Sequence, residues 1–296
     1  MLRLPAVAGQ FYPADSKELS ALVEKFTRKE DSQEGKSVRA CLVPHAGYQY
    51  SGATAGAVFA RILLPQKILI LGVRHYPHGE AQAIVSEGAW RTPLGDAPID
   101  TPLAMRLRKH CPALREDRVA HSREYSLEVE LPFLQTLCPK LSFVPIAVGT
   151  QRFEDLQEMG EGLAKALEEV REDVLMVTSS DMNHYEDDET TRRKDRKAID
   201  RMLRLDAAGL YEVCRKEQVS MCGLGPAVAM LTAMKRLGAA QGELVHYATS
   251  GDASGNTPQP TRPSVCCSPT TASTKSFWLT ADSTARRSFT LSNGGW

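Results

Sequence analysis

The sequence predicts an α/β fold, a single domain with a mixed central sheet flanked by helices. Three observations support this. Short apolar runs alternate with helix-type segments along most of the chain. Four of these runs, 38–44, 67–72, 141–148 and 173–178, are mainly apolar without a polar/apolar alternation, which is typical of strands buried on both faces. No internal repeat or linker interrupts the pattern before residue 252.

Each element follows from local periodicity and from the residues that interrupt it. The helix at 16–29 places Leu19, Leu22 and Val23 on one face, as an amphipathic helix requires. The charged run 186–195 is expected to be the solvated start of a helix. In order we expect a helix at 16–29, a loop at 29–37, a strand at 38–44, a helix at 53–63, strands at 67–72 and 81–86, helices at 101–110 and 126–137, a strand at 141–148, a helix at 153–170, a strand at 173–178, helices at 197–217 and 225–237 and a strand at 243–249.

Charge and composition exclude several classes of function. The chain has 36 basic and 36 acidic side chains, without the basic excess of a nucleic-acid or membrane-surface binder. No apolar run is long enough to span a bilayer, and early prolines argue against a signal peptide. The seven cysteines show no disulfide framework and no CxxC pair. We therefore expect a cytoplasmic protein with reduced thiols that binds neither nucleic acid nor membrane.

Five reactive side chains follow strands or turns in the expected fold. His45 and His75 come just after two strands, at the edge of an α/β sheet where ligands bind. Asp181 and His184 follow a third strand, and Cys222 lies in MCGLGP. Imidazole and thiolate together suit Fe(II), zinc or copper. Each residue also has a structural reading: packed histidines, a buried small thiol, and an aspartate that caps a helix.

Several segments resemble one family in order along most of the chain. They are PAVAGQFYP (5–13), PHAGYQYSG (44–52), ILG followed by His75, SLEVELPFLQ (126–135), SSD (179–181) followed by His184, CG (222–223) and YATSGD (247–252). Together they resemble the Memo family, known in bacteria and archaea as protein B of the AmmeMemoRadiSam system.

This resemblance implies the fold of class III extradiol dioxygenases, a LigB-like fold. It implies metal ligation by His45, His75 and Cys222, with Fe(II) as the first expectation and copper or zinc as alternatives. His184 is similar to the acid/base histidine of those dioxygenases, and Asp181 is placed to orient it. Radical-SAM and AMMECR-type proteins are the implied partners, and a small-molecule or peptide ligand is left open.

Two positions near the implied site depart from the family pattern. Arg74 stands where the family has Asn or Ser before the histidine, and it could bind an anionic substrate or point to solvent. Tyr125 replaces a histidine, and a phenol cannot act as a cation near pH 7. These changes bear on catalysis more than on metal binding.

The C-terminal segment also departs from the family. We expect a Memo-like α/β domain over 1–252 and an atypical Ser/Thr-rich tail over 253–296, in which only 276–279 is locally apolar. This composition rarely forms a packed core. The family continues with a closing strand, so the tail is expected to be disordered or the product of a frameshift.

Two functions remain open at the level of sequence. The first is a metal-dependent redox enzyme, similar to a non-haem iron dioxygenase, in which His184 moves protons. The second is a non-catalytic binding or scaffold protein that uses the same pocket for metal or peptide. A protein without metal is a third reading. A Ser-His-Asp hydrolase is not expected, because the chain contains no GxSxG turn.

Overall fold

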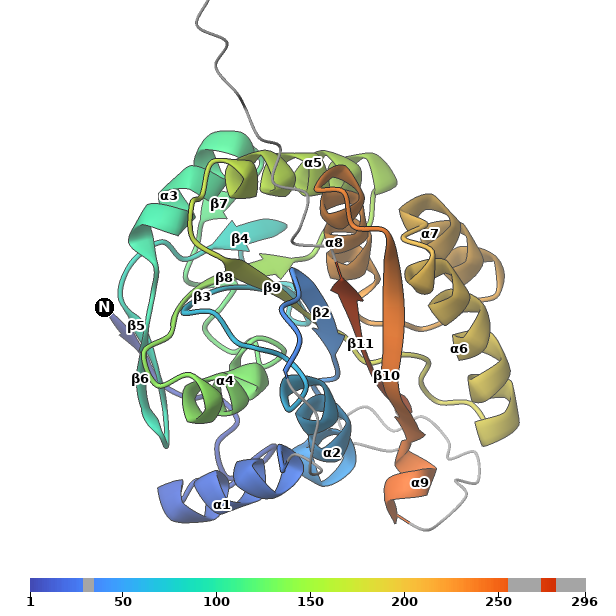
Figure 1. Cartoon of the computed structure of the whole chain (residues 1–296), viewed down its shortest axis with the longest axis horizontal. Coiled ribbons are helices and arrows are strands. Elements are labelled where there is room, and N and C mark those ends of the chain that lie inside the picture. Colours follow the sequence, from blue (N-terminus) through green and yellow to red (C-terminus); the bar gives the residue numbers. More distant parts are fainter. Residues whose placement is uncertain (29–34, 255–272, 281–296) are drawn as a thin grey trace, which may run out of the picture.

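A mixed sheet forms the centre of the computed structural model, which describes residues 1–28 and 35–252 and the backbone of 253–254 and 273–280 (Figure 1). Strands β2, β9, β3 and β8 are parallel, β4 is antiparallel to β8, and β11 is antiparallel to both of its neighbours. In spatial order the strands are β10 Gln241–Thr249, β11 Ser273–Thr280, β2 Ala40–Val43, β9 Val174–Ser179, β3 Lys67–Val73, β8 Ser142–Val148, β4 Gln82–Ile84 and β7 Arg115–Glu116.

Helices lie on both faces of this sheet (Figure 1). A small separate sheet consists of β1 Leu2–Arg3, β5 Ala89–Thr92 and β6 Gly95–Pro98. The helices are α1 Ser16–Phe26, α2 Tyr48–Phe59, α3 Thr101–His110, the 3₁₀ turn η1 Glu128–Glu130, α4 Leu131–Leu137, α5 Phe153–Glu168, α6 Asp188–Leu203, α7 Ala207–Lys216, α8 Leu224–Arg236 and α9 Ser250–Ser254. This arrangement confirms the predicted α/β class.

The central strands are largely apolar because both faces of the sheet are covered. In β3, Leu69 and Leu71 pack with residues of α3, α5 and α8, whereas Ile68 and Ile70 pack with residues of α1, α2 and α4. All four side chains are fully buried. Burying one aliphatic side chain of this size stabilises a fold by about 1.5–3 kcal/mol. The four continuous apolar runs of the sequence are these parallel strands.

Aspartates fix the starts of several helices. The side chains of Asp15, Asp100, Asp187 and Asp206 accept hydrogen bonds from backbone N–H groups in the first turns of α1, α3, α6 and α7. Such caps stabilise a helix by about 1 kcal/mol each. The cap at Asp187 starts α6 within the charged run, as predicted.

The predicted helix at 197–217 is wrong as a single element. It is two helices, because Leu205 adopts a left-handed backbone conformation with φ of 53°. Asp206 then starts the second helix by accepting the N–H of Gly209 at 2.9 Å. The continuous helix-forming composition on either side hid this break.

The expectation of a tail beyond residue 252 needs correction at one segment. Residues 273–280 form β11, between β10 and β2. The segment contains Thr, Phe and Trp, which favour strands, and its backbone pairs with the edge of β2, which would otherwise present unpaired N–H and C=O groups. The predictions for 255–272 and 281–296 concern residues that lie outside the described part of the chain. No helix in the described part is long and apolar enough to cross a membrane.

Candidate metal centre

Three neighbouring parallel strands deliver polar residues to one edge of the sheet. His45 lies two residues after β2, Asp181 two residues after β9, and His75 two residues after β3. Because β9 pairs with both β2 and β3, these residues emerge side by side. The structure thus brings the two predicted histidines together where the sequence places them.

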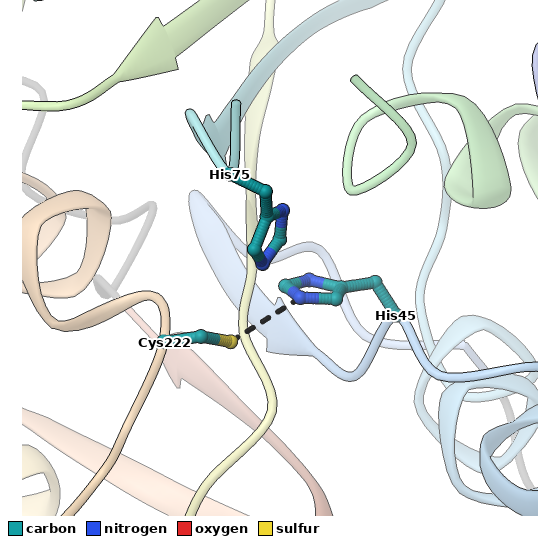
Figure 2. A group of neighbouring side chains, drawn as sticks. All are labelled: His45, His75 and Cys222. Atoms are coloured by element: carbon teal, nitrogen blue, oxygen red, sulfur yellow. Dashed lines mark hydrogen bonds between the residues drawn. The ribbon is translucent and has the colours of Figure 1, made fainter. Parts of the chain in front are cut away.

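Cys222 approaches the histidines from the loop before α8. Its Sγ lies 3.2 Å from Nε2 of His45, and the three side chains point toward one another (Figure 2). Ligand atoms of His45, His75 and Cys222 all lie within 4.8 Å of one another. His45 is buried, whereas the other two are half-buried. One ion could therefore contact all three.

Gly223, directly after the cysteine, occupies a position where a larger residue does not fit. Its N–H donates to Oγ of Ser180 at 3.0 Å, and a Cβ at this position would collide with the Ser180 side chain. The glycine thus lets the loop approach the end of β9 closely. The backbone N–H of Asp181 in turn donates to Sγ of Cys222 at 3.2 Å.

Ser179 and Glu130 hold His45 in a defined orientation. Nδ1 of His45 lies 2.7 Å from Oγ of Ser179, and that hydroxyl donates to Oε1 of Glu130 at 2.8 Å. Since the hydroxyl proton is used, the oxygen accepts from Nδ1–H, which leaves the Nε2 lone pair facing Cys222. Burial lowers the pKa of His45 to about 4, so the ring is neutral at pH 7.

Glu124 holds His75 in the same way. Its Oε1 lies 2.9 Å from Nδ1 of His75, and its Oε2 accepts the His75 backbone N–H at 2.7 Å. Burial alone would raise the pKa of Glu124, but the hydrogen bonds and charge of His75 lower it to about 2. The ring of Tyr125 stacks on the imidazole of His75, with the ring centroids 4.6 Å apart and an angle of 7° between the ring planes. The imidazole therefore has little freedom to turn.

Asp181 and His184 also lie close to Cys222. Oδ1 of Asp181 accepts the His45 backbone N–H at 2.9 Å. Nδ1 of His184 lies 2.9 Å from the Ser220 carbonyl oxygen, which therefore sets the orientation of the His184 ring. Ligand atoms of Asp181, His184 and Cys222 also lie within 4.8 Å of one another.

The donor set fits a transition-metal ion. Two imidazoles, each with Nδ1 engaged by a buried partner, and one thiol suit Fe(II), zinc or copper. Burial raises the pKa of the Cys222 thiol, and the nearby Asp181 carboxylate raises it further. A coordinating metal deprotonates a thiol outright, so the site favours thiolate only together with a cation.

Sequence reasoning missed the residues behind the histidines. Glu124, Glu130 and Ser179 are buried and hydrogen-bonded to the site, but none was assigned a role there. The available signal was Glu130 within SLEVELPFLQ, an acidic residue next to apolar residues that are buried in the fold. Burial raises the pKa of Glu130, and a buried carboxyl group requires a partner, which in this fold is Ser179 of the site.

Known proteins of one family are similar to this chain. A family model described as Memo-like protein matches residues 3–261. The MEMO1 family protein MK0963 of Methanopyrus kandleri is 41% identical over 268 residues, covering 86% of this chain and 95% of that protein. A MEMO1 family protein of Aquifex aeolicus is 41% identical over 256 residues, covering 86% and 94%.

A search of solved structures gives a distant neighbour. The crystal structure of uncharacterized protein JW3007 from Escherichia coli K12 covers 81% of this chain and 98% of its own, with a TM-score of 0.47 and 14% identity.

Proposed function

The chain belongs to the family of Memo-like proteins, and from this premise we propose that it binds a transition-metal ion through His45, His75 and Cys222. Fe(II) is the proposed metal, and copper and zinc are the alternatives. The observation that carries the proposal is the convergence of three ligand atoms within 4.8 Å. Unrelated packing would not also require each histidine to have its Nδ1 fixed by a buried partner.

The proposed chemistry is a redox or dioxygenase-like reaction. Fe(II) held by His45, His75 and Cys222 would supply redox chemistry at this site. His184 is the proposed acid/base group: its Nδ1 is held by the Ser220 carbonyl oxygen, which leaves Nε2 to exchange protons. Asp181 is the proposed positioning residue, because its carboxylate holds the backbone of His45 and its N–H contacts Cys222.

Metal content after anaerobic purification tests the proposal. Wild type should contain near-stoichiometric metal, or take it up when Fe(II), copper or zinc is added. His45→Ala and Cys222→Ser should lose it. Cys138→Ser is a matched control, since Cys138 is also half-buried but contacts the Pro65 carbonyl oxygen instead. A folded wild-type protein that takes up none of these metals would overturn the proposal.

A binding protein without turnover is the second candidate. Tyr125 favours it, because a phenol stacked on His75 takes the place of a residue that could carry positive charge near pH 7. Steady-state turnover of catechols under O₂ separates the two candidates. Absence of turnover together with tight binding of a protein partner would favour the binding protein.

The partners remain part of the proposal. A radical-SAM protein and an AMMECR-type protein are the proposed candidates, on the basis of the family resemblance alone. Co-purification with each purified candidate, compared between wild type and Cys222→Ser, tests whether an intact centre is needed. Retention of neither candidate would remove this part of the proposal.

A further inference from the structure

A cavity of about 270 Å³ lies beside the proposed metal centre and shares Cys222 with it. Its other lining includes Arg74 and Gly149 at the ends of β3 and β8, Tyr211 and Arg215 on α7, and the first turn of α8. The volume is just below the range of about 300–1,000 Å³ for pockets that hold drug-sized ligands. The space therefore suits a small molecule.

The charges around this cavity have one sign. Arg74 and Arg215 line it, and none of the described residues in its lining is acidic. Arg215 is exposed and lies 5.6 Å from the Tyr211 ring, without a carboxylate partner in the described part of the chain. The nearby Asp155 carboxylate accepts the Thr150 hydroxyl at 2.8 Å and does not line the cavity.

Arg74 retains unused hydrogen-bond donors. Only its Nη1 has a protein acceptor, the Gly79 carbonyl oxygen, and its buried Nε has no partner among the described residues. The guanidinium lies against Gly149, where any Cβ would collide with Nε. A planar guanidinium with free donors is suited to carboxylate and phosphate groups.

The start of α8 adds a third positive feature. This 13-residue helix has Gly223 at its N-cap, with no side-chain hydrogen bond to the first turn. Leu224 and Gly225, at its first two positions, line the cavity. Pro226, at the third position, has no N–H, and the Leu224 N–H donates to the Met221 carbonyl oxygen at 3.4 Å, so the contribution of α8 to binding an anion is chiefly the positive end of its dipole. The two arginines and this helix end thus surround the same space.

We propose that this cavity binds the carboxylate or phosphate group of a small organic ligand, whose other end extends to the metal centre at Cys222. The inference rests on the proposed metal function for the role of Cys222, but the anion site stands on Arg74, Arg215 and α8. It names the substrate class of the site as small organic anions.

Calorimetric titration with two probe anions tests the proposal. Inorganic phosphate and benzoate are titrated separately into metal-free and zinc-loaded protein at low ionic strength, because salt screens exposed charges. At least one should bind with a Kd on the order of 1 mM. Arg74→Gln and Arg215→Gln should each weaken binding by about tenfold, the loss expected for a hydrogen bond to a charged group. The tighter probe identifies the ligand's anionic group.

Arg171→Gln is the matched control. Arg171 is exposed and lines neither this cavity nor the neighbouring basic surface that shares Arg215 with it, so this variant removes the same charge without changing the proposed site. Wild-type protein that binds neither probe, or Arg171→Gln that weakens binding as much as Arg74→Gln does, would overturn the inference. Arg215 is at the surface, so its variant should fold even if Arg74→Gln does not.

Metal content measured on the same samples separates this inference from the proposed function. Loss of anion binding in Arg74→Gln with metal retained supports both. Arg74-dependent anion binding in a protein that takes up no metal would support the anion site and overturn the metal centre. Metal uptake without anion binding would support the metal centre and overturn the anion site.

Discussion

Nδ1 of His75 lies 2.9 Å from Oε1 of the buried Glu124 carboxylate, a contact that fixes both the tautomer and the direction of the imidazole. The ring carries its proton on Nδ1 and presents Nε2 to the proposed centre. Carboxylates that accept from a metal-bound histidine also increase its basicity as a ligand. This pair makes His75 a better ligand than its half-exposed position alone would suggest.

Replacing Glu124 with glutamine should weaken metal binding by about 10–100-fold while leaving all three proposed ligands in place. Competition with a chelator of known affinity measures the change. Glu116→Gln provides the control, since Glu116 also accepts hydrogen bonds from a serine, Ser86, but lies away from the centre. Equal affinity of Glu124→Gln and wild type would show that the pair does not support metal binding.

Ser179→Ala should affect both metal affinity and stability. It removes the acceptor for Nδ1–H of His45, and a buried donor without a partner costs about 1–3 kcal/mol. Metal affinity should also fall by about tenfold, because the imidazole is free to turn. Urea unfolding of the metal-free protein and chelator competition measure the two effects.

The neighbouring Thr178 provides the comparison for Ser179→Ala. Its hydroxyl is fully buried and makes no hydrogen bond within the described part of the chain. Thr178→Val removes this hydroxyl at nearly constant shape, so the free energy of unfolding should stay the same or rise. If both variants lose stability equally, the hydrogen bond from His45 to Ser179 contributes nothing specific.

The sequence predicted the central strands because their apolar runs are local and continuous. It predicted His45 and His75 because each directly follows such a run. It did not reveal the hydrogen-bonded contact between Ser179 and Glu130, which joins residues 49 positions apart. Sequence alone carries no information on which long-range partner satisfies a buried carboxylate.

The place of β11 was also beyond sequence reasoning. The segment contains Thr, Phe and Trp, which favour strands, but its position depends on pairing with β2, more than 200 residues away. Similarly, Leu205 follows α6 in a left-handed backbone conformation without a glycine or proline to mark the break. Both features depend on tertiary context that the local sequence does not contain.

Two neutral buried histidines should make the metal-free protein less stable in mild acid. Burial lowers the pKa of both His45 and His121 to about 4. For His121, Nδ1 lies 2.8 Å from the Asp117 carbonyl oxygen. The unfolded chain binds a proton near pH 6.5, whereas the folded chain does not until about pH 4. The contribution of these two neutral histidines to the free energy of unfolding is therefore fully present above pH 6.5 and is lost as the pH falls toward 4.

For His121 this effect corresponds to about 3 kcal/mol. His121→Gln keeps a side-chain donor near Asp117 but cannot titrate. Urea unfolding of the metal-free protein between pH 4 and 8 should show a shallower loss of stability in the variant than in wild type. Parallel curves for the two proteins would contradict a neutral buried His121.

Removal of β11 should destabilise the sheet at β2. A chain that ends at residue 254 lacks the strand that pairs antiparallel with both β10 and β2, which leaves two strand edges without their partner. Open edges promote association between chains, so we expect a lower thermal midpoint and aggregation at concentrations where the full chain stays monodisperse. Thermal unfolding and light scattering measure both effects.

A chain that ends at residue 280 keeps the strand and is the control. If the two shortened chains behave alike, β11 does not stabilise the domain. If only the shorter chain aggregates, the strand closes the sheet even though its composition differs from the rest of the core.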